Sequence, residues 1–411
     1  MDALTAAADR YIGLVLAIGV HDPDYVDAYY GPPERRAQAL AARQPLEAID
    51  RDASDLLGSL TAAGPPPAGD VLIRLRYDYV TRQLASLRSR VALLRGERLT
   101  FDEESLALYD AVAPRIDAGV FEDAIDELGR RLPGHGSVLE RYDGYRQQLV
   151  IPRDRLDATF TAAIEACRAR TREHIVLPAD ERFTVEYVTD KSWSGYNWYQ
   201  GEYRSLIQVN TDLPIFIDRA IDLACHEGYP GHHVYNVLLE RHLVRDRGWT
   251  EFSVYALFSP QSLVAEGTAN FGIEVAFPRA ERLELERQVI FPAAGLDPSR
   301  ADEYYEMLTL VERLSYAGNE AARRYVDGEI DAGTAAEWLE RYALYSPPRA
   351  RQRVRFIEQY RSYVINYNLG KDLVREYVEA QGGTASNEAR RWQVFEELIS
   401  SPRLPSGLST S

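Results

Sequence analysis

The sequence predicts a mainly helical fold with a small antiparallel β-sheet near its middle. Three observations support this prediction: apolar residues recur at helical spacing along most of the 411 residues, prolines stand at or near the ends of these segments, and only two short stretches alternate with period two. We expect one continuous body over 1–411. Its N-terminal part, 1–175, is helical, and its second part, 183–411, contains the sheet at 183–210.

Helical segments fill the first part of the chain. The longest runs over 70–95, where apolar residues recur at every third or fourth position. Pro114, Pro133 and Pro152 separate the shorter segments that follow. In chain order the expected helices are 2–20, 33–60, 70–95, 102–112, 121–131, 136–149 and 154–175.

The two alternating stretches are 183–189 and 205–210, and both are rich in β-branched and aromatic residues. We interpret them as a small sheet or hairpin, with the aromatic stretch 192–201 between them. An edge strand at this place can bind an extended chain through backbone hydrogen bonds, and the alternative is a surface hairpin with an aromatic face. Next, 211–214 carries a helix-start signal for 215–225, and 234–244 resumes helical spacing.

Charge and composition exclude several classes of protein. The formal net charge of −16 argues against binding to nucleic acid or to an anionic membrane. Two cysteines cannot form a disulfide framework, the N-terminus has no secretory pattern, and the apolar run 11–20 is too short to cross a bilayer. We therefore expect a cytoplasmic protein. The 26 tyrosines indicate either a partly hydrated helical interior or a polar, aromatic cleft.

Three of the seven histidines lie in one stretch, Asp222–His233. A His-Glu pair followed by another His is the sequence form of a helical zinc site, in which two imidazoles bind the metal and the glutamate acts on a bound water. The usual spacing between the two histidines is four residues. Here His226 is followed by His232 and His233, and on an unbroken helix neither can share one ion with His226.

Pro230 and Gly231 resolve this difficulty. Proline breaks the hydrogen-bond ladder of a helix and glycine accepts unusual dihedrals, so two residues can loop out and bring His232 to the place of an i+4 histidine. The alternative is that this segment is only a helix-ending turn and that hydrogen bonds satisfy the histidines. The doublet leaves open whether His232 or His233 is the second ligand.

A tetrahedral zinc site with one open position needs a third protein ligand. The best downstream residue is Glu266, which small and apolar residues flank on a predicted helix, because a buried carboxylate requires a partner. Asn270 and Glu274 lie on the same face of that helix, and either can orient a ligand histidine. Asp222, one turn before His226, is a weaker option for the same role.

These residues resemble a bacterial family of unknown function with the signature His-Glu-x-x-Pro-Gly-His, which reads here as His226 to His232. The family is similar to the gluzincin zinc peptidases, including oligopeptidases and thermostable carboxypeptidases. The resemblance covers most of the chain, with further matches at 22–25, at Glu266-Gly267 and at 363–371. It implies a large helical fold with a deep cleft. One departure is Thr268, where members of the family often carry an aromatic residue.

The resemblance also implies a role for a late tyrosine. A Tyr-x-x-Gly pattern matches Tyr367 to Gly370, and related peptidases bring such a tyrosine back to the zinc. Its phenol can donate a hydrogen bond to the oxyanion of the attacked carbonyl. Tyr367 on an amphipathic helix is otherwise a core residue, and Tyr363 is the alternative, one turn earlier.

The expected function is zinc-dependent hydrolysis of short peptides, with carboxypeptidase action as one form of it. His226, His232 and Glu266 hold zinc in this hypothesis, and Glu227 is the general base that takes a proton from water and passes it to the leaving amine. An arginine would pair with a terminal carboxylate, and the sequence does not choose among Arg349, Arg351, Arg353 and Arg355. The alternatives are a metal-dependent hydrolase of a non-peptide amide or ester and a catalytically silent small-ligand-binding protein. The oligomeric state, and metals other than zinc, stay open.

Overall fold

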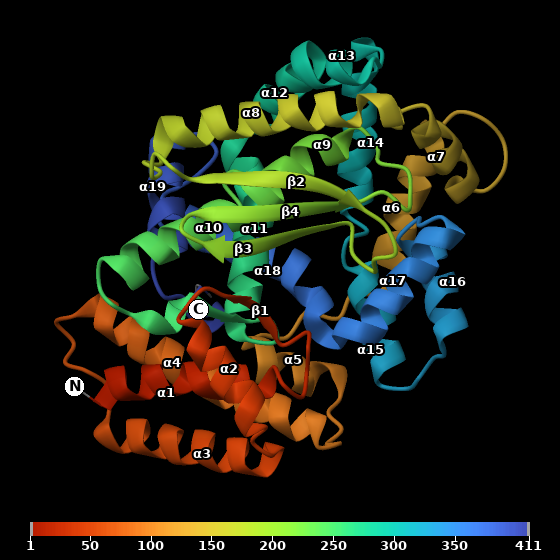
Figure 1. Cartoon of the computed structure of the whole chain (residues 1–411). Coiled ribbons are helices and arrows are strands. Elements are labelled where there is room, and N and C mark those ends of the chain that lie inside the picture. The colour runs from red at the N-terminus through yellow and green to blue at the C-terminus, as the bar shows by residue number, and fades with distance from the viewer. Residues whose placement is uncertain (1–2, 409–411) are drawn as a thin grey trace.

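The computed structural model describes residues 3–408, and helices dominate it (Figure 1). The predicted helices of the first part are confirmed, although 33–60 is divided in two. The division falls at Gln44-Pro45, because proline disfavours helical dihedrals in the residue before it. In chain order the elements are α1 (Ala3–Ile18), β1 (Val26–Tyr29), α2 (Pro33–Ala42), α3 (Leu46–Ala63), α4 (Val71–Leu94), α5 (Phe101–Tyr109), α6 (Ala118–Arg131), α7 (Val138–Gln147) and α8 (Leu156–His174).

The predicted sheet is confirmed and has three strands: β2 (Arg182–Val188), β3 (Gly195–Gly201) and β4 (Arg204–Asn210). β3 and β4 form an antiparallel hairpin, whereas β2 pairs in parallel with the other side of β4, so the sheet is mixed. The aromatic stretch between the two expected strands is thus itself the edge strand β3. A second sheet, which the sequence did not reveal, pairs β1 antiparallel with β5 (Val254–Ala256).

The helix expected directly after Pro214 begins later, at Asp218. Residues 215–217 are held outside the helix by backbone hydrogen bonds to an earlier segment: Ile151 N donates to Ile215 O (2.9 Å), and Ile217 N donates to Leu149 O (2.9 Å). This pairing with a distant segment outweighs the local helix-start signal. α9 (Asp218–Leu223) then continues as a turn of π-helix, Ala224–Gly228.

Apart from β5, the remaining regular structure of the described chain is helical. Its α-helices are α10 (His232–Leu239), α11 (Pro260–Ala276), α12 (Arg279–Leu285), α13 (Phe291–Ala294), α14 (Ala301–Glu312), α15 (Ala317–Val326), α16 (Ala332–Tyr342), α17 (Pro347–Tyr360), α18 (Ile365–Ala380) and α19 (Glu388–Ile399). In Figure 1 the three-stranded sheet lies across the middle of the molecule, α8 runs beside β2, and α1, α3 and α4 form a layer below.

α11 is the central helix, buried along nearly its whole length. It packs tightly against α18 where two glycines meet: a Cβ on Gly267 would lie 2.4 Å from the carbonyl oxygen of Gly370, and a Cβ on Gly370 would lie 2.7 Å from Leu263 O. Any larger residue would push the helices apart.

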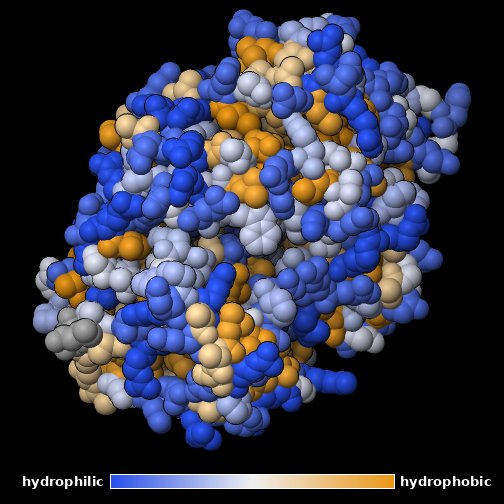
Figure 2. All heavy atoms as spheres, viewed as in Figure 1, coloured by the Kyte–Doolittle hydropathy of each residue, from blue (hydrophilic) through white to orange (hydrophobic). Residues whose placement is uncertain are grey.

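Around this core, hydrophilic side chains cover most of the face seen in Figure 2. Within 3–408, the helices include none with the length and apolar character that crossing a bilayer requires.

Candidate metal centre

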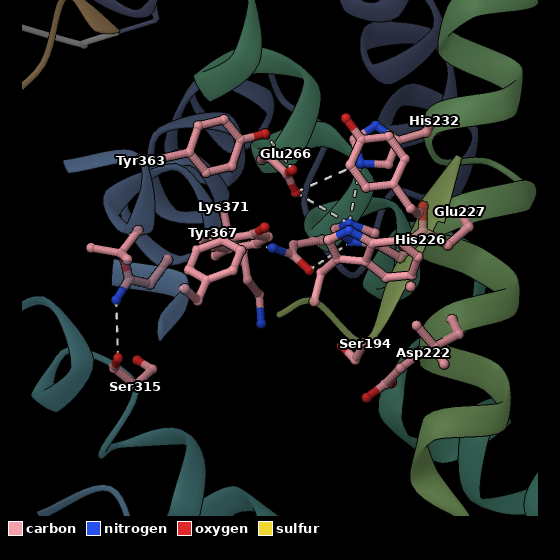
Figure 3. Close-up of a pocket in the computed structure, with 18 of the residues that line it drawn as sticks. Ser194, Asp222, His226, Glu227, His232, Glu266, Ser315, Tyr363, Tyr367 and Lys371 are labelled. Carbon is pink, nitrogen blue, oxygen red and sulfur yellow. Dashed lines mark hydrogen bonds and ion pairs between the residues drawn. The ribbon is translucent and has the colours of Figure 1, made fainter. Parts of the chain in front are cut away.

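Three side chains converge beside α11: His226 from the π-helical turn, His232 from the start of α10, and Glu266 from α11 (Figure 3). The Nε2 atoms of the two histidines are 3.2 Å apart, and Glu266 Oε2 lies 3.2 Å from His226 Nε2 and 3.6 Å from His232 Nε2. Ligand atoms placed tetrahedrally about 2.0–2.1 Å from a zinc ion are roughly 3.3 Å apart. The three atoms therefore have the spacing of a metal site.

The backbone between the histidines breaks where the sequence predicted. After the π-helical turn, residues 229–231 leave the helix and α10 restarts at His232. Gly231 lies so close to the preceding turn that a Cβ there would be 2.0 Å from His226 O. Only glycine fits this approach, and the approach returns His232 to the side of His226.

Of the two histidines in the doublet, His232 lies in the cluster and His233 does not. His233 points away from the cluster into a fully buried position, where its Nε2 lies 3.0 Å from Glu181 Oε2 and its Nδ1 lies 2.8 Å from Ser205 Oγ. A carboxylate only accepts hydrogen bonds, so Nε2 carries the proton and Nδ1 accepts from Ser205. Glu181 also accepts a hydrogen bond from Tyr229 (2.6 Å), and so it holds both ends of the looped segment.

Glu266 is held by one partner and leaves one oxygen free. Tyr363 donates a hydrogen bond to Oε1 (2.8 Å), whereas the buried Oε2 has no hydrogen-bond partner within the described residues. A buried carboxylate oxygen without a donor is costly unless a cation occupies the place beside it. This orphaned oxygen, aimed at two imidazole nitrogens, is what a metal ligand requires.

Asn270, rather than Glu274 or Asp222, orients His226. Its side-chain nitrogen donates to Tyr367 O (2.9 Å), so its Oδ1 faces His226 Nδ1 at 3.0 Å. That contact places a proton on Nδ1 and leaves Nε2 of His226 unprotonated toward the cluster. Glu274 instead pairs with Lys371 and Arg375, and Asp222 pairs with Arg282 and Arg219.

Glu227 lies beside the cluster and next to the edge strand. A Cβ on Gly195 would lie 2.8 Å from Glu227 Oε1, so the absence of a side chain lets β3 approach this carboxylate. Asn197, also on β3, donates a hydrogen bond to Glu227 O (2.7 Å) and fixes the turn against the strand. Burial raises the pKa of Glu227, while the nearby His226 and His232 act in the opposite direction.

Tyr367 lies across the cluster from Glu227 (Figure 3). Its ring stacks on that of His226 with centroids 6.5 Å apart, and its hydroxyl makes no hydrogen bond to a described residue. Tyr363 is committed to Glu266 by contrast. Of the two tyrosines considered from the sequence, Tyr367 is the one with a free phenol beside the cluster.

The cluster opens into a cavity of about 830 Å³. The lining combines residues of β3, α9, α11, α14, α15, α17 and α18 with Asp27 of β1. Asp27 was not expected from the sequence: Tyr196 of β3 donates a hydrogen bond to it, and burial raises its pKa to about 6. No local pattern marks this residue, because it lies far from His226 in the chain.

Electrostatic interactions couple the three side chains of the cluster. Burial alone would lower the pKa of His232, but the neighbouring Glu266 carboxylate outweighs it and raises that pKa to about 9. The same pairing, together with His226, holds the pKa of Glu266 well below its usual range despite burial. The Glu266 carboxylate is thus ionised. In the absence of a metal the proton on His232 balances its negative charge, and a bound divalent cation would replace that proton.

Comparisons with known proteins show similarity of fold. No family model and no curated protein matches the chain. A solved structure from Colwellia psychrerythraea, described as a candidate lipoprotein, aligns with TM-score 0.52 at 14% identity over 90% of this chain and 70% of that one. A candidate lipoprotein of unknown function from Shewanella oneidensis aligns with TM-score 0.48 at 14% identity (92% and 78% covered), and a Pyrococcus furiosus carboxypeptidase with TM-score 0.42 at 14% identity (97% and 88%).

Proposed function

We propose that the protein is a metal-dependent hydrolase, a zinc metallopeptidase of the gluzincin type that acts on short peptides. The observation that carries this proposal is the spacing of the three ligand atoms of His226, His232 and Glu266, all within 4.8 Å of one another, with Glu266 Oε2 lacking a partner within the described residues. Two imidazoles and one carboxylate are a donor set that suits zinc and leaves a fourth position open.

The residues around the cluster supply the remaining roles. His226, His232 and Glu266 would hold a divalent cation, which would supply Lewis acidity toward a carbonyl oxygen and toward water. Glu227 lies within the same cavity and is the general base that takes a proton from the attacking water and delivers it to the leaving amine. Tyr367 donates a hydrogen bond to the carbonyl oxygen as that oxygen becomes negative.

The surroundings favour a short peptide over a folded protein. The cavity has a limited volume, and residues 193–197, at and just before the start of β3, line it beside Glu227. A strand edge supports an extended chain through backbone hydrogen bonds, which are independent of side-chain identity. A few residues of extended peptide fill such a space.

Metal content and hydrolysis test the proposal together. Protein dialysed against zinc and then against buffer should retain one zinc ion per chain. Short acetylated peptides should be hydrolysed by the wild type, and Glu227→Gln should lower kcat by about 10²–10⁴-fold without loss of zinc. Glu186→Gln, an exposed glutamate on β2, is the matched control and should leave kcat unchanged.

Four other results would contradict the proposal or a part of it. Protein that binds no divalent metal refutes the central proposal. Zinc binding with hydrolysis that is indifferent to Glu227→Gln refutes the role of this glutamate. Turnover of esters or non-peptide amides alone assigns a different hydrolase, and ligand binding without any turnover assigns a silent binding protein.

A further inference from the structure

The cations that line the cavity are mostly neutralised by neighbouring acids. Lys371 and Arg375 both contact Glu274 at 2.7 Å, Arg313 contacts Glu127 at 2.7 Å, and Arg219 contacts Asp222 at 3.3 Å. Such pairing is expected in a chain that has 63 acidic and 47 basic residues. A cavity-lining arginine without an acid therefore requires an explanation.

Arg349 and Arg353 are two such arginines. They lie one turn apart on α17 and both line the cavity, and neither forms an ion pair with a described carboxylate. Arg349 donates a hydrogen bond to Gln352 Oε1 (2.6 Å) on its own helix, and Arg353 lies over the rings of Phe356 and Tyr367. The Nε of Arg353 is buried without a hydrogen-bond partner.

Placing these two charges here costs stability in three ways. Arg349 lies in the first turn of α17, where the helix macrodipole disfavours a cation, and that turn contains no acidic residue. Like charges at i and i+4 repel. Burial lowers the pKa of Arg349 to about 10, and the charges of Arg353 and Arg219 act in the same direction. The hydrogen bond to Gln352 and the aromatic rings beside the two arginines offset part of this cost, but no described carboxylate neutralises either charge.

The pair is close to the candidate metal centre. The Arg353 guanidinium is 5.6 Å from the centroid of the Tyr367 ring, which is 6.5 Å from that of His226. An extended chain advances about 3.3–3.6 Å per residue. The Arg353 guanidinium therefore lies no more than about 12 Å from the His226 ring, which roughly three to four residues of an extended peptide span. Arg351 and Arg355, the other two arginines of this helix segment, are exposed.

We propose that Arg349 and Arg353 form a subsite for a carboxylate of the substrate, on the α17 side of the candidate metal centre. The inference rests on the proposed peptide hydrolysis and adds that the substrate carries an anionic group there. Guanidinium groups bind carboxylates through paired hydrogen bonds, and an incoming carboxylate removes the repulsion between the two arginines. The carboxylate is either the C-terminus of the peptide or an acidic side chain.

Binding to metal-free protein tests the subsite separately from catalysis. Calorimetric titrations compare N-acetyl-Ala-Ala-Phe with its C-terminal amide, and N-acetyl-Ala-Ala-Glu-amide with N-acetyl-Ala-Ala-Gln-amide. At least one acid should bind about 10- to 100-fold more tightly than its neutral counterpart. Arg349→Gln and Arg353→Gln should each reduce that ratio strongly, whereas the exposed control Arg351→Gln should leave it unchanged.

The outcomes separate the two proposals. A preference for the first acid assigns the terminal carboxylate, and a preference for the second assigns an acidic side chain. Equal binding of all pairs, no binding of any peptide, or a preference that survives both arginine variants overturns the subsite. Hydrolysis with zinc that ignores the carboxylate also overturns the subsite but leaves the peptidase standing. A carboxylate preference in binding without any hydrolysis supports the subsite but overturns the proposed peptidase activity.

Discussion

Glu181→Gln tests what holds the looped segment between the two histidines of the cluster. Glu181 is fully buried and accepts hydrogen bonds from four side chains: from Tyr229 (2.6 Å) and His233 (3.0 Å) at one oxygen, and from Arg168 (2.8 Å) and Arg172 (2.7 Å) at the other. Tyr229 and His233 lie on either side of the break that brings His232 to His226. A neutral glutamine loses both ion pairs and keeps only one accepting oxygen.

The size of the effect follows from the pKa of this carboxyl. Burial would raise it, but the hydrogen bonds from His233, Tyr229 and Arg168 outweigh burial and lower the pKa to about 2, against an ordinary value of 4.5. Each pKa unit corresponds to about 1.4 kcal/mol, which gives up to about 3 kcal/mol of unfolding free energy. The two arginines are 40% and 43% exposed, and solvent screening reduces the expected loss to about 2 kcal/mol.

Urea unfolding of wild type and Glu181→Gln at several pH values measures this loss. Because the pKa is lower in the folded state, the contribution of Glu181 is fully present above about pH 4.5 and disappears as the pH falls toward about 2. The stability difference should therefore be about 2 kcal/mol at pH 7 and shrink below pH 4.5. The same variant should bind zinc more weakly, since its looped segment is less firmly held.

Glu186→Gln is the control, because Glu186 is an exposed glutamate on β2, the strand that directly follows Glu181. It should change the unfolding free energy by less than about 0.5 kcal/mol. Equal stability of Glu181→Gln and wild type at pH 7 would refute the reasoning. So would a difference that stays constant down to pH 3, since it would not arise from the ionised carboxylate.

Three further substitutions probe the site. Gly231→Ala places a Cβ 2.0 Å from His226 O and should abolish zinc binding in equilibrium dialysis, whereas Gly318→Ala, whose Cβ meets no atom within 4 Å, should have no effect. Tyr363→Phe removes the donor to Glu266 Oε1 and should weaken zinc binding about 10- to 100-fold in chelator competition; Tyr325→Phe is its control. Arg349→Gln should raise the free energy of unfolding in urea by about 0.5–1 kcal/mol, because it removes a charge that no acid neutralises. A lower free energy of unfolding would show instead that Arg349 stabilises the fold.

Local sequence predicted the helices well because their signals are local. The helix expected over 70–95 is α4, and Asp70 caps it by accepting a hydrogen bond from Ile73 N (3.0 Å). The failures arise from long-range pairing. The parallel contact of β2 with β4, the β1–β5 pair and the extended residues 215–217 all depend on segments that are distant in the chain. Periodicity carries no information about such partners.

The same distinction applies to the site. The motif around Pro230-Gly231 predicted the break and placed His226 near His232, since chain geometry alone excluded an unbroken helix. Glu266 was predicted because a carboxylate among apolar residues needs a partner, and the structure brings it to the two histidines. The choice of Asn270 over Glu274 depends on how α11 is rotated against α18, and Glu181 carries no local signal at all.

The crossing of α11 and α18 connects these observations. Gly267 and Gly370 let the two backbones approach, and the approach brings Tyr367 O within 2.9 Å of the Asn270 amide. That hydrogen bond fixes the amide orientation, and the amide in turn fixes the proton on His226 Nδ1 and frees its Nε2. The glycine three residues after Tyr367 therefore does more than permit packing. By bringing Tyr367 O to the Asn270 amide, the close approach at Gly370 also favours the His226 orientation in which Nε2 faces Glu266. Tyr367 thus acts through its backbone carbonyl, while its phenol faces the cavity.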